Sequence, residues 1–334
     1  MIAQLSKDYI KIGGFKKVSQ RILSYFFEGR PLTTKGRFIN VLMAPLISFL
    51  IFLKVKKPIK TYFIVGQGRS GSTYLGLLLS LKMDYFFMNE PKLPWSIVNQ
   101  TDDLVGSYTK RGSYSFDKID NQAPRRINSF YSCMSFFTGS KVIIDKYPEM
   151  IFRRSWIIKN LPESKFLILY RDYFSIVASI PSWNDKYSNL HSSWWGKDNR
   201  KWDLIKNELI PKSKILKGHN SLTDNLNDYE KSLVEWMLTV EQNIELIKSD
   251  QYKFYIFNYE EFEISLDIFI TKESVNTNEF SKVREYFKRT YRNKKYNDLA
   301  HLDNCNKELI DLSVKLESCF KDVWQTYKSI NSLT

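Results

Sequence analysis

Cysteine is scarce in this sequence of 334 residues, which contains only Cys133, Cys305 and Cys319. Their number is odd, and none of them belongs to a CxxC pair or to another closely spaced group. Both facts argue against a disulfide framework and against a zinc site built from cysteines. The sequence therefore favours a protein that folds in a reducing compartment.

A hydrophobic run long enough to cross a membrane is also lacking. The best candidate, residues 39–53, contains Asn40 and Pro45 and lies too far from the first residue for an ordinary secretory signal. A bilayer core needs roughly 20 apolar residues, so the run predicts core or interfacial packing, with a membrane anchor as the alternative. Residues 15–26 have the pattern of a basic amphipathic helix, so contact with a membrane surface is an alternative to packing against the protein. We assign residues 1–59 to an N-terminal helical extension.

Acidic residues are outnumbered, since 36 Asp and Glu stand against 50 Lys and Arg, a formal charge of +14. This excess favours anionic partners such as nucleotides, acidic glycans, nucleic acid or a lipid surface, and its sign does not choose among them. The basic residues are spread along the chain without a recognisable nucleic-acid-binding motif. We therefore expect no nucleic-acid partner.

Short apolar runs that alternate with helical patterns are the main regularity of the chain. Four runs predict strands, at residues 60–65, 141–144, 166–170 and 253–257. Apolar strands that alternate with helices are typical of a parallel sheet covered on both faces, with ligands at the carboxyl ends of the strands. Long helical patterns at 229–248 and 309–329 supply outer layers. The sequence thus predicts one α/β domain over residues 60–334.

The octapeptide GQGRSGST, residues 66–73, follows the first predicted strand and precedes a helical pattern. Its glycines let the backbone turn so that N–H groups and the helix N-terminus converge on an anion. The outline is that of the nucleotide-binding P-loop, GxxxxGK[ST], but Ser72 replaces the lysine. A nucleoside triphosphatase needs that lysine together with a magnesium site, so the loop predicts phosphate binding without hydrolysis of ATP or GTP.

A second informative segment is FLILYRDYFSIVAS, residues 166–179, a predicted strand that ends at Arg171 with Ser179 eight residues further on. An arginine at a strand tip can clamp a phosphate through two hydrogen bonds, and a helical serine can reach the same anion from the side. Together the two segments resemble the signatures of the sulfotransferases that use 3′-phosphoadenosine 5′-phosphosulfate (PAPS). Tyr173 stands where that family has a proline. Looser matches are DKYP at 145–148, NYEEF at 258–262, and Trp236 ahead of the latter.

The resemblance implies a three-layer P-loop-type fold, PAPS as the donor substrate and no metal ion. In that family the loop holds the 5′-phosphosulfate, which implies this role for Arg69, Ser70, Gly71, Ser72 and Thr73. Arg171 and Ser179 would hold the 3′-phosphate. Lys146, at the end of a predicted strand, would contact the phosphosulfate or the acceptor.

Histidine, a common catalytic base, is nearly absent. The three histidines are His191, His219 and His301. All of them follow the second motif, whereas the histidine-based cytosolic sulfotransferases place theirs between the two motifs. Glu90 lies where carbohydrate and tyrosylprotein sulfotransferases and many bacterial relatives carry a glutamate beside the acceptor. We therefore expect Glu90 to take the proton of the acceptor, with Lys146 and Arg69 stabilising the charge that develops on the donor.

The sequence is less informative about the acceptor than about the donor. Four tryptophans, Trp183, Trp194, Trp195 and Trp202, suit either a sugar platform or the packing of a lid, and a basic stretch at 288–295 suits either closure over the nucleotide or a solvated helix end. We expect a glycan or glycolipid acceptor, with small hydroxylated metabolites as the alternative. We expect a cytoplasmic enzyme, either free or peripheral at the inner membrane face, with a membrane-anchored protein held through residues 39–53 as the alternative. A P-loop kinase or other phosphotransferase, and a non-enzymatic basic binder of membranes or nucleic acid, remain as competing functions.

Overall fold

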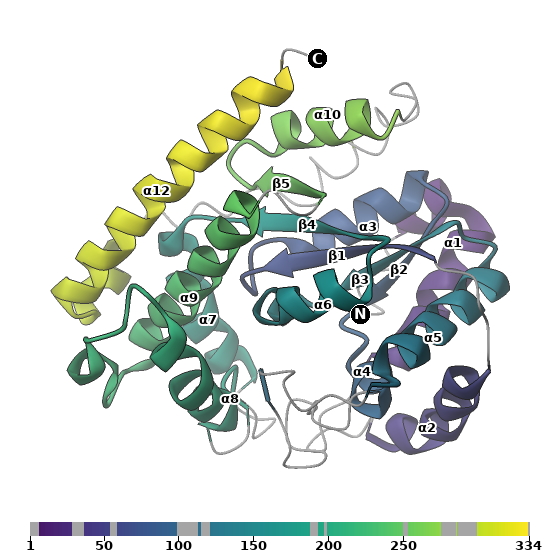
Figure 1. Cartoon of the computed structure of the whole chain (residues 1–334), viewed down its shortest axis with the longest axis horizontal. Coiled ribbons are helices and arrows are strands. Elements are labelled where there is room, and N and C mark those ends of the chain that lie inside the picture. The colour runs from purple at the N-terminus through teal and green to yellow at the C-terminus, as the bar shows by residue number, and fades with distance from the viewer. Residues whose placement is uncertain are drawn as a thin grey trace.

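The computed structural model describes residues 7–28, 37–53, 59–98, 113–114, 121–187, 193–196, 199–249, 253–274, 285 and 299–332. Within them one sheet of five parallel strands has the order β2-β3-β1-β4-β5 (Figure 1). The strands are β1 (Lys60–Gly66), β2 (Tyr85–Asn89), β3 (Val142–Lys146), β4 (Ser164–Tyr170) and β5 (Phe254–Asn258). The predicted central parallel sheet is confirmed.

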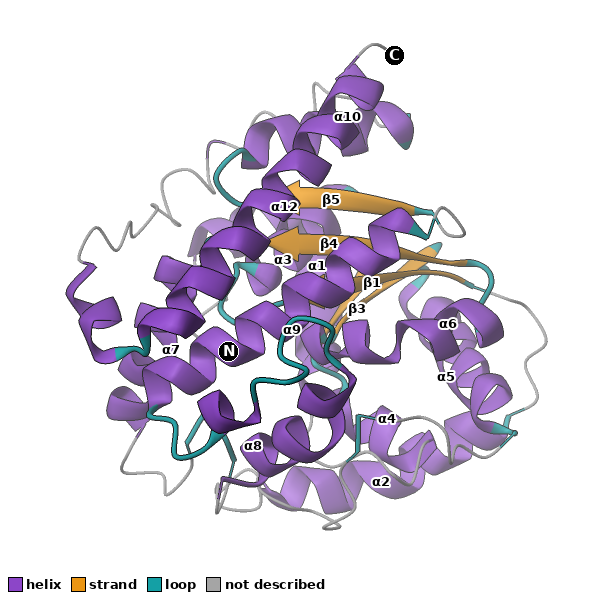
Figure 2. Ribbon diagram, turned by 60° about the vertical axis from the view of Figure 1, so that its left-hand side comes forward, coloured by secondary structure: helices purple, strands orange, loops and turns teal. Residues whose placement is uncertain are grey.

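Helices enclose this sheet on both faces (Figure 2). Those that matter below are α1 (Lys7–Phe27), α2 (Arg37–Phe52), α3 (Ser72–Lys82), α4 (Lys92–Val98), α5 (Ala123–Thr138), α6 (Arg154–Asn160), α7 (Tyr173–Tyr187), α8 (Arg200–Leu204), α9 (Asp228–Lys248), α10 (Phe262–Lys272) and α12 (Lys307–Ser332). Because successive side chains of a strand point to opposite faces, β1 contributes to two separate cores. Phe63 and Val65 pack with α5, α7 and α9, whereas Tyr62 and Ile64 pack with α3 and α10. The three-layer α/β architecture is therefore confirmed.

The four strands predicted from the sequence are present, and β2 is the strand that the sequence did not predict. It is a short apolar run that begins three residues after α3 ends, so nothing in the local pattern separates it from the helix. Its pairing with β3 places Asn89 beside Lys146. This register brings the residue after Asn89, which is Glu90, to the same sheet edge as the end of β3.

The two N-terminal helices pack against the body of the molecule. Phe27 of α1 and Ile47, Leu50 and Ile51 of α2 are buried in the larger of the two cores. Glycine at position 14 has φ 61 and interrupts α1 with a kink. Within the described residues, no helix is both long enough and apolar enough to span a membrane.

Candidate functional site

The loop between β1 and α3 has the geometry of an anion cradle. Gly66 has φ 132, and a Cβ at this position would lie 2.2 Å from the carbonyl oxygen of Leu169, so only glycine fits. Gly71, at the N-cap of α3, has φ 94 and supplies no side-chain cap. The first N–H groups of α3 therefore face the loop without a capping side chain, and such a helix N-terminus attracts anions.

The end of β4 lies beside this loop because β4 pairs with β1, with Leu169 opposite Gly66. One Nη of Arg171 donates to the carbonyl oxygen of Arg69 at 3.1 Å, and Nε of Arg69 donates to Oγ of Ser179 at 3.0 Å. The structure thus brings Arg69 together with Arg171 and Ser179, which lie about a hundred residues further along the chain. They offer two guanidinium groups and a hydroxyl at one sheet edge, which is a donor set suited to a phosphate.

Tyr259 completes the wall of the cradle. Its ring lies 4.4 Å below the guanidinium carbon of Arg171, and a Cβ at Gly71 would lie 2.7 Å from the same ring. The peptide N–H of Tyr259 donates to the carbonyl oxygen of Tyr170 at 2.9 Å. The indole N–H of Trp236 donates to the carbonyl oxygen of Arg171, also at 2.9 Å. These contacts fix the arginine between an aromatic face and the tip of its own strand.

Glu90 and Lys146 form the second part of the site. The two residues form an ion pair, and Nζ of Lys92 approaches the other carboxylate oxygen of Glu90 at 3.2 Å. Burial opposes ionisation of Glu90, but the ammonium groups of Lys146 and Lys92 outweigh it and hold the pKa of this carboxyl well below its usual range. Burial likewise opposes the charge on Lys92, yet Glu90 raises the pKa of that ammonium. Glu90 is thus ionised and held by two cations.

The hydroxyl of Thr73 connects the phosphate loop to the segment that carries Glu90. Thr73 Oγ donates to the side-chain oxygen of Asn89 at 3.3 Å, so the phosphate loop contacts the residue just before Glu90. Ser70 and Ser72 are buried, and the Ser70 hydroxyl donates to the carbonyl oxygen of Gln67 at 2.5 Å. The nine predicted site residues therefore lie along the carboxyl edge of β1, β3, β4 and β2.

Asp145, the neighbour of Lys146, has a different role. Its carboxylate is fully buried and accepts hydrogen bonds from the Trp95 indole at 2.8 Å and from the Tyr131 hydroxyl at 2.6 Å. Burial and this carboxylate raise the pKa of Tyr131 well above its usual value. Asp145 thus anchors α4 and α5 to the end of β3.

The sequence pattern did not group Lys201, Glu235 and Glu149, because they come from three separate segments of the chain. Lys201 pairs with Glu235 at 2.6 Å and with Glu149 at 3.5 Å, and its ammonium lies 4.5 Å from the ring centroid of Trp194. The Trp194 indole N–H donates to Glu235 at 2.9 Å. A Cβ at Gly68 would lie 2.4 Å from the Trp194 ring, which shows that this indole rests on the phosphate loop.

The other tryptophans of this region divide into two kinds. Trp195 and Trp202 are buried against each other with ring centroids 5.7 Å apart, whereas Trp183 is partly exposed and lies 5.8 Å from Trp194. Trp195 and Trp202 are therefore packing residues, and Trp183 with Trp194 presents aromatic surface next to the loop. His191 and the basic stretch 288–295 lie outside the described residues.

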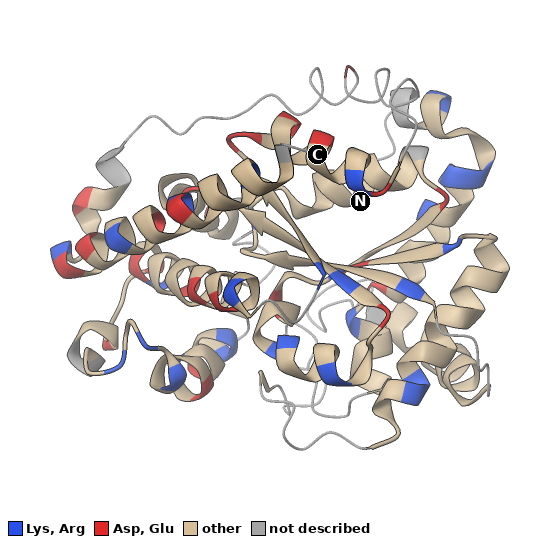
Figure 3. Ribbon diagram, turned by 45° about the horizontal axis from the view of Figure 1, so that its top comes forward, with Lys and Arg blue, Asp and Glu red and all other residues tan. Residues whose placement is uncertain are grey.

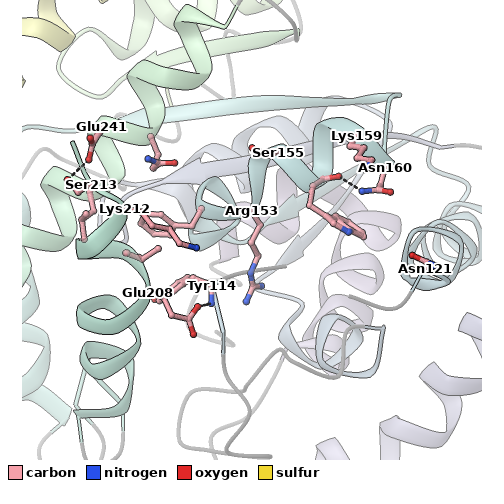
Figure 4. A pocket seen from close by; sticks show the side chains of 15 residues that line it. Tyr114, Asn121, Arg153, Ser155, Lys159, Asn160, Glu208, Lys212, Ser213 and Glu241 are labelled. Atoms are coloured by element: carbon pink, nitrogen blue, oxygen red, sulfur yellow. Dashed lines mark hydrogen bonds between the residues drawn. The ribbon is translucent and has the colours of Figure 1, made fainter. Parts of the chain in front are cut away.

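A separate cavity of about 530 Å³ lies between α6, α9 and the short helical segment 205–212 (Figure 4). Its walls carry both signs of charge, with Arg153, Lys159 and Lys212 against Glu208 and Glu241. None of the nine predicted site residues lines it. The cavity is therefore distinct from the phosphate cradle.

A metal centre is not evident in the part of the chain that the structure describes. Among those residues no group of three or more His, Cys, Asp or Glu is arranged to hold a metal ion. The charged groups of the predicted site are the cations Arg69, Arg171 and Lys146 and the carboxylate of Glu90.

Two comparisons with known proteins give matches. The model of the sulfotransferase family matches residues 62–263, a span that includes the phosphate loop, Glu90, Lys146, Arg171 and Ser179. The fold is similar to the crystal structure of sulfotransferase STF9 from Mycobacterium avium, at 10% sequence identity and a TM-score of 0.48, over 85% of this chain and 80% of that one. No curated protein gives a significant sequence match. On the family match, this chain belongs to the sulfotransferase family.

Proposed function

We propose that the protein transfers a sulfuryl group from PAPS to a hydroxyl of a glycan or glycolipid. The observation that carries this proposal is that Arg69 and Arg171, which follow two adjacent strands, meet Ser179 of α7. A donor with phosphates at both its 5′ and its 3′ positions needs two anion sites side by side. The loop with the α3 N-terminus suits one of them, and the Arg171 and Ser179 pair suits the other.

The proposed reaction uses Glu90 and Lys146 in distinct roles. The acceptor oxygen forms a bond to sulfur while the bond between sulfur and the bridging oxygen of the phosphosulfate breaks. The hydroxyl proton goes to Glu90, and the electron pair of the broken bond leaves with the 5′-phosphate as adenosine 3′,5′-bisphosphate. Lys146 and Arg69 stabilise the charge on that leaving group.

The low pKa of Glu90 constrains this mechanism, because a carboxylate held by two ammonium groups is a weak base. An anionic donor in the cradle competes with Glu90 for Lys146, and loss of that contact raises the basicity of Glu90. We therefore propose that donor binding precedes activation of the base. In this order Glu90 stays paired with Lys146 until the donor binds.

The acceptor class is supported by the aromatic surface beside the loop. Trp183 and Trp194 are partly exposed, and charged groups from Glu235 and Lys201 contact Trp194. Aromatic faces with hydrogen-bonding groups at their edge suit sugar rings. Because PAPS is produced in the cytosol, the proposal also places the enzyme on the cytoplasmic side.

Differential binding tests the proposed donor. Adenosine 3′,5′-bisphosphate is expected to raise the melting temperature of the protein, and ATP with magnesium to raise it less, because the loop lacks the P-loop lysine. Stronger stabilisation by ATP with magnesium would instead support a phosphotransferase. Transfer of label from sulfur-labelled PAPS to glycans, glycolipids and small hydroxylated metabolites then identifies the acceptor.

A further inference from the structure

Large apolar side chains are exposed unevenly over the molecule. Among the described residues fifteen such side chains are exposed, and twelve of them lie on α1, α2 or α5. The remaining three are scattered over α10 and α12 as Ile264, Val314 and Ile330. The three helices that carry these twelve side chains also pack against one another. Helix α2 contacts both α1 and α5, and the ring centroids of Phe27 of α1 and Phe130 of α5 lie 5.3 Å apart. A concentration of this size on one part of a surface is typical of an interaction site.

Helix α2 carries most of this apolar surface. Its exposed apolar residues are Phe38, Val41, Leu42, Leu46, Phe49 and Phe52. Their spacing repeats at three and four residues, so they form one stripe along the outer side of the helix. The opposite side, with Ile47, Leu50 and Ile51, is buried in the core. The helix is therefore apolar on both sides, and only one side is buried against the described part of the protein.

The charged residues of α2, α4 and α5 have one sign, whereas α1 also contains an aspartate. Helices α2, α4 and α5, which pack together, contain no Asp or Glu, and α5 presents Arg125 and Arg126. The guanidinium of Arg126 lies 6.0 Å from the ring centroid of Phe52, at the end of the stripe. At the far end of α5, Phe136 and Phe137 are exposed. Helices α9 and α12, on the left in Figure 3, instead carry acidic side chains interspersed with lysines.

We propose that the outer faces of α2 and of the adjoining parts of α1 and α5 dock on an anionic lipid surface, with α2 lying in the plane of the interface. An apolar stripe bordered by arginines matches acyl chains below anionic head groups. A second copy of the chain matches it poorly, because a symmetric dimer through this face would bring the two arginine-bordered surfaces together. This inference is independent of the proposed sulfuryl transfer.

Sedimentation with vesicles tests the proposal. Wild-type protein is expected to bind vesicles of phosphatidylcholine mixed with phosphatidylglycerol, and to bind vesicles of phosphatidylcholine alone more weakly. The double variant Leu42→Glu/Phe49→Glu removes two stripe residues and is expected to lower the partition coefficient at least about tenfold. Both side chains are exposed in the folded protein, so circular dichroism and the melting temperature are expected to match those of the wild type.

A matched control separates the apolar stripe from net charge. The variant Val314→Glu/Ile330→Glu makes the same change in charge at two exposed apolar positions of α12. Its vesicle binding is expected to stay within about threefold of wild type, because these positions lie on another helix and distant charges are screened. Equal losses in both variants, or no binding of wild type to anionic vesicles, would overturn the proposal. A dimer that Leu42→Glu/Phe49→Glu dissociates in analytical ultracentrifugation, without vesicle binding, would assign the stripe to a second copy instead.

Discussion

Glu90 lies in a backbone conformation that glycine favours, with φ 50, and its side chain is held by two lysines. For a residue with a Cβ this conformation costs about 1–2 kcal/mol. The peptide N–H of Glu90 donates to the carbonyl oxygen of Lys146 at 2.6 Å, which helps to hold the turn. Arg69, in the phosphate loop, also has positive φ, at 68°. Strain at two of the proposed site residues is typical of positions selected for geometry in a functional site.

Replacement of Glu90 by glutamine separates catalysis from binding. The variant Glu90→Gln keeps the size of the side chain and removes its basicity, so turnover is expected to fall about 10²- to 10⁴-fold. Affinity for adenosine 3′,5′-bisphosphate, measured by calorimetry, is expected to stay the same or to rise, because Lys146 loses a competing anion. Glu149→Gln is the matched control, since Glu149 also interacts with the charge of Lys92. The turnover of this variant is expected to fall less than about tenfold. Turnover of Glu90→Gln within about threefold of wild type would exclude Glu90 as the base.

Arg171 is expected to recognise the 3′-phosphate. The variant Arg171→Ala removes a charged hydrogen-bond donor worth roughly 1.5–3 kcal/mol, so affinity for adenosine 3′,5′-bisphosphate is expected to fall at least about tenfold. Affinity for adenosine 5′-phosphosulfate, which lacks the 3′-phosphate, is expected to change little. The comparison matters because Arg171 also binds the loop through the Arg69 carbonyl. An equal loss for both ligands would assign Arg171 a structural role.

At the scale of elements, the sequence predicted the parts of the fold whose pattern is local. Four buried strands and the glycine loop were evident because apolar runs, turn residues and helix periods are local signals. The strand β2 was missed because it is short and follows α3 closely. The contacts of Glu90 with Lys92 and Lys146 and of Trp194 with the loop depend on tertiary packing. No local pattern contains that information.

The contact between β1 and β4 depends on Gly66. A Cβ there would lie 2.2 Å from a backbone oxygen of β4, whereas a Cβ at Gly139, which also has positive φ, meets no atom within 4 Å. We expect Gly139→Ala to cost about 1 kcal/mol from backbone strain alone and Gly66→Ala to cost more than about 3 kcal/mol, because β4 must move. Urea unfolding measures both values. Similar losses of unfolding free energy in the two variants would show that β4 can move away from residue 66 at little cost.

At the scale of the whole molecule, the two edges of the sheet have different chemistry. The proposed site occupies the carboxyl edge, while a charged cluster closes the amino edge around Glu273, the residue that follows α10. Glu273 accepts from Lys60 at 2.7 Å and from Lys165 at 2.5 Å, and it also accepts from the Tyr255 hydroxyl. It therefore ties the end of α10 to β1, β4 and β5. Changes in this cluster are expected to affect stability and leave donor binding intact.

The pH dependence of unfolding tests this division. Burial opposes ionisation of Glu273, but hydrogen bonds from Lys165, Lys60 and Tyr255 lower its pKa from 4.5 to about 2. Because the folded pKa lies below the unfolded one, the stabilisation is complete above about pH 5 and is lost as pH falls toward 2. Glu273→Gln is therefore expected to lower the free energy of unfolding by about 2 kcal/mol at neutral pH and by much less near pH 2. Urea titrations at several pH values measure the difference.

Asp84→Asn serves as the control for that experiment, because Asp84 pairs with Lys16 at 3.0 Å while both side chains are about half exposed. An exposed pair of this kind contributes only about 0–1 kcal/mol, so this variant is expected to follow wild type at every pH. Affinity for adenosine 3′,5′-bisphosphate at neutral pH is expected to be unchanged in Glu273→Gln. A loss of stability in Glu273→Gln that stays constant down to pH 2 would show that packing, and not the charge of Glu273, holds the amino edge together. Loss of nucleotide affinity in a variant that remains folded would show that the two edges of the sheet are coupled.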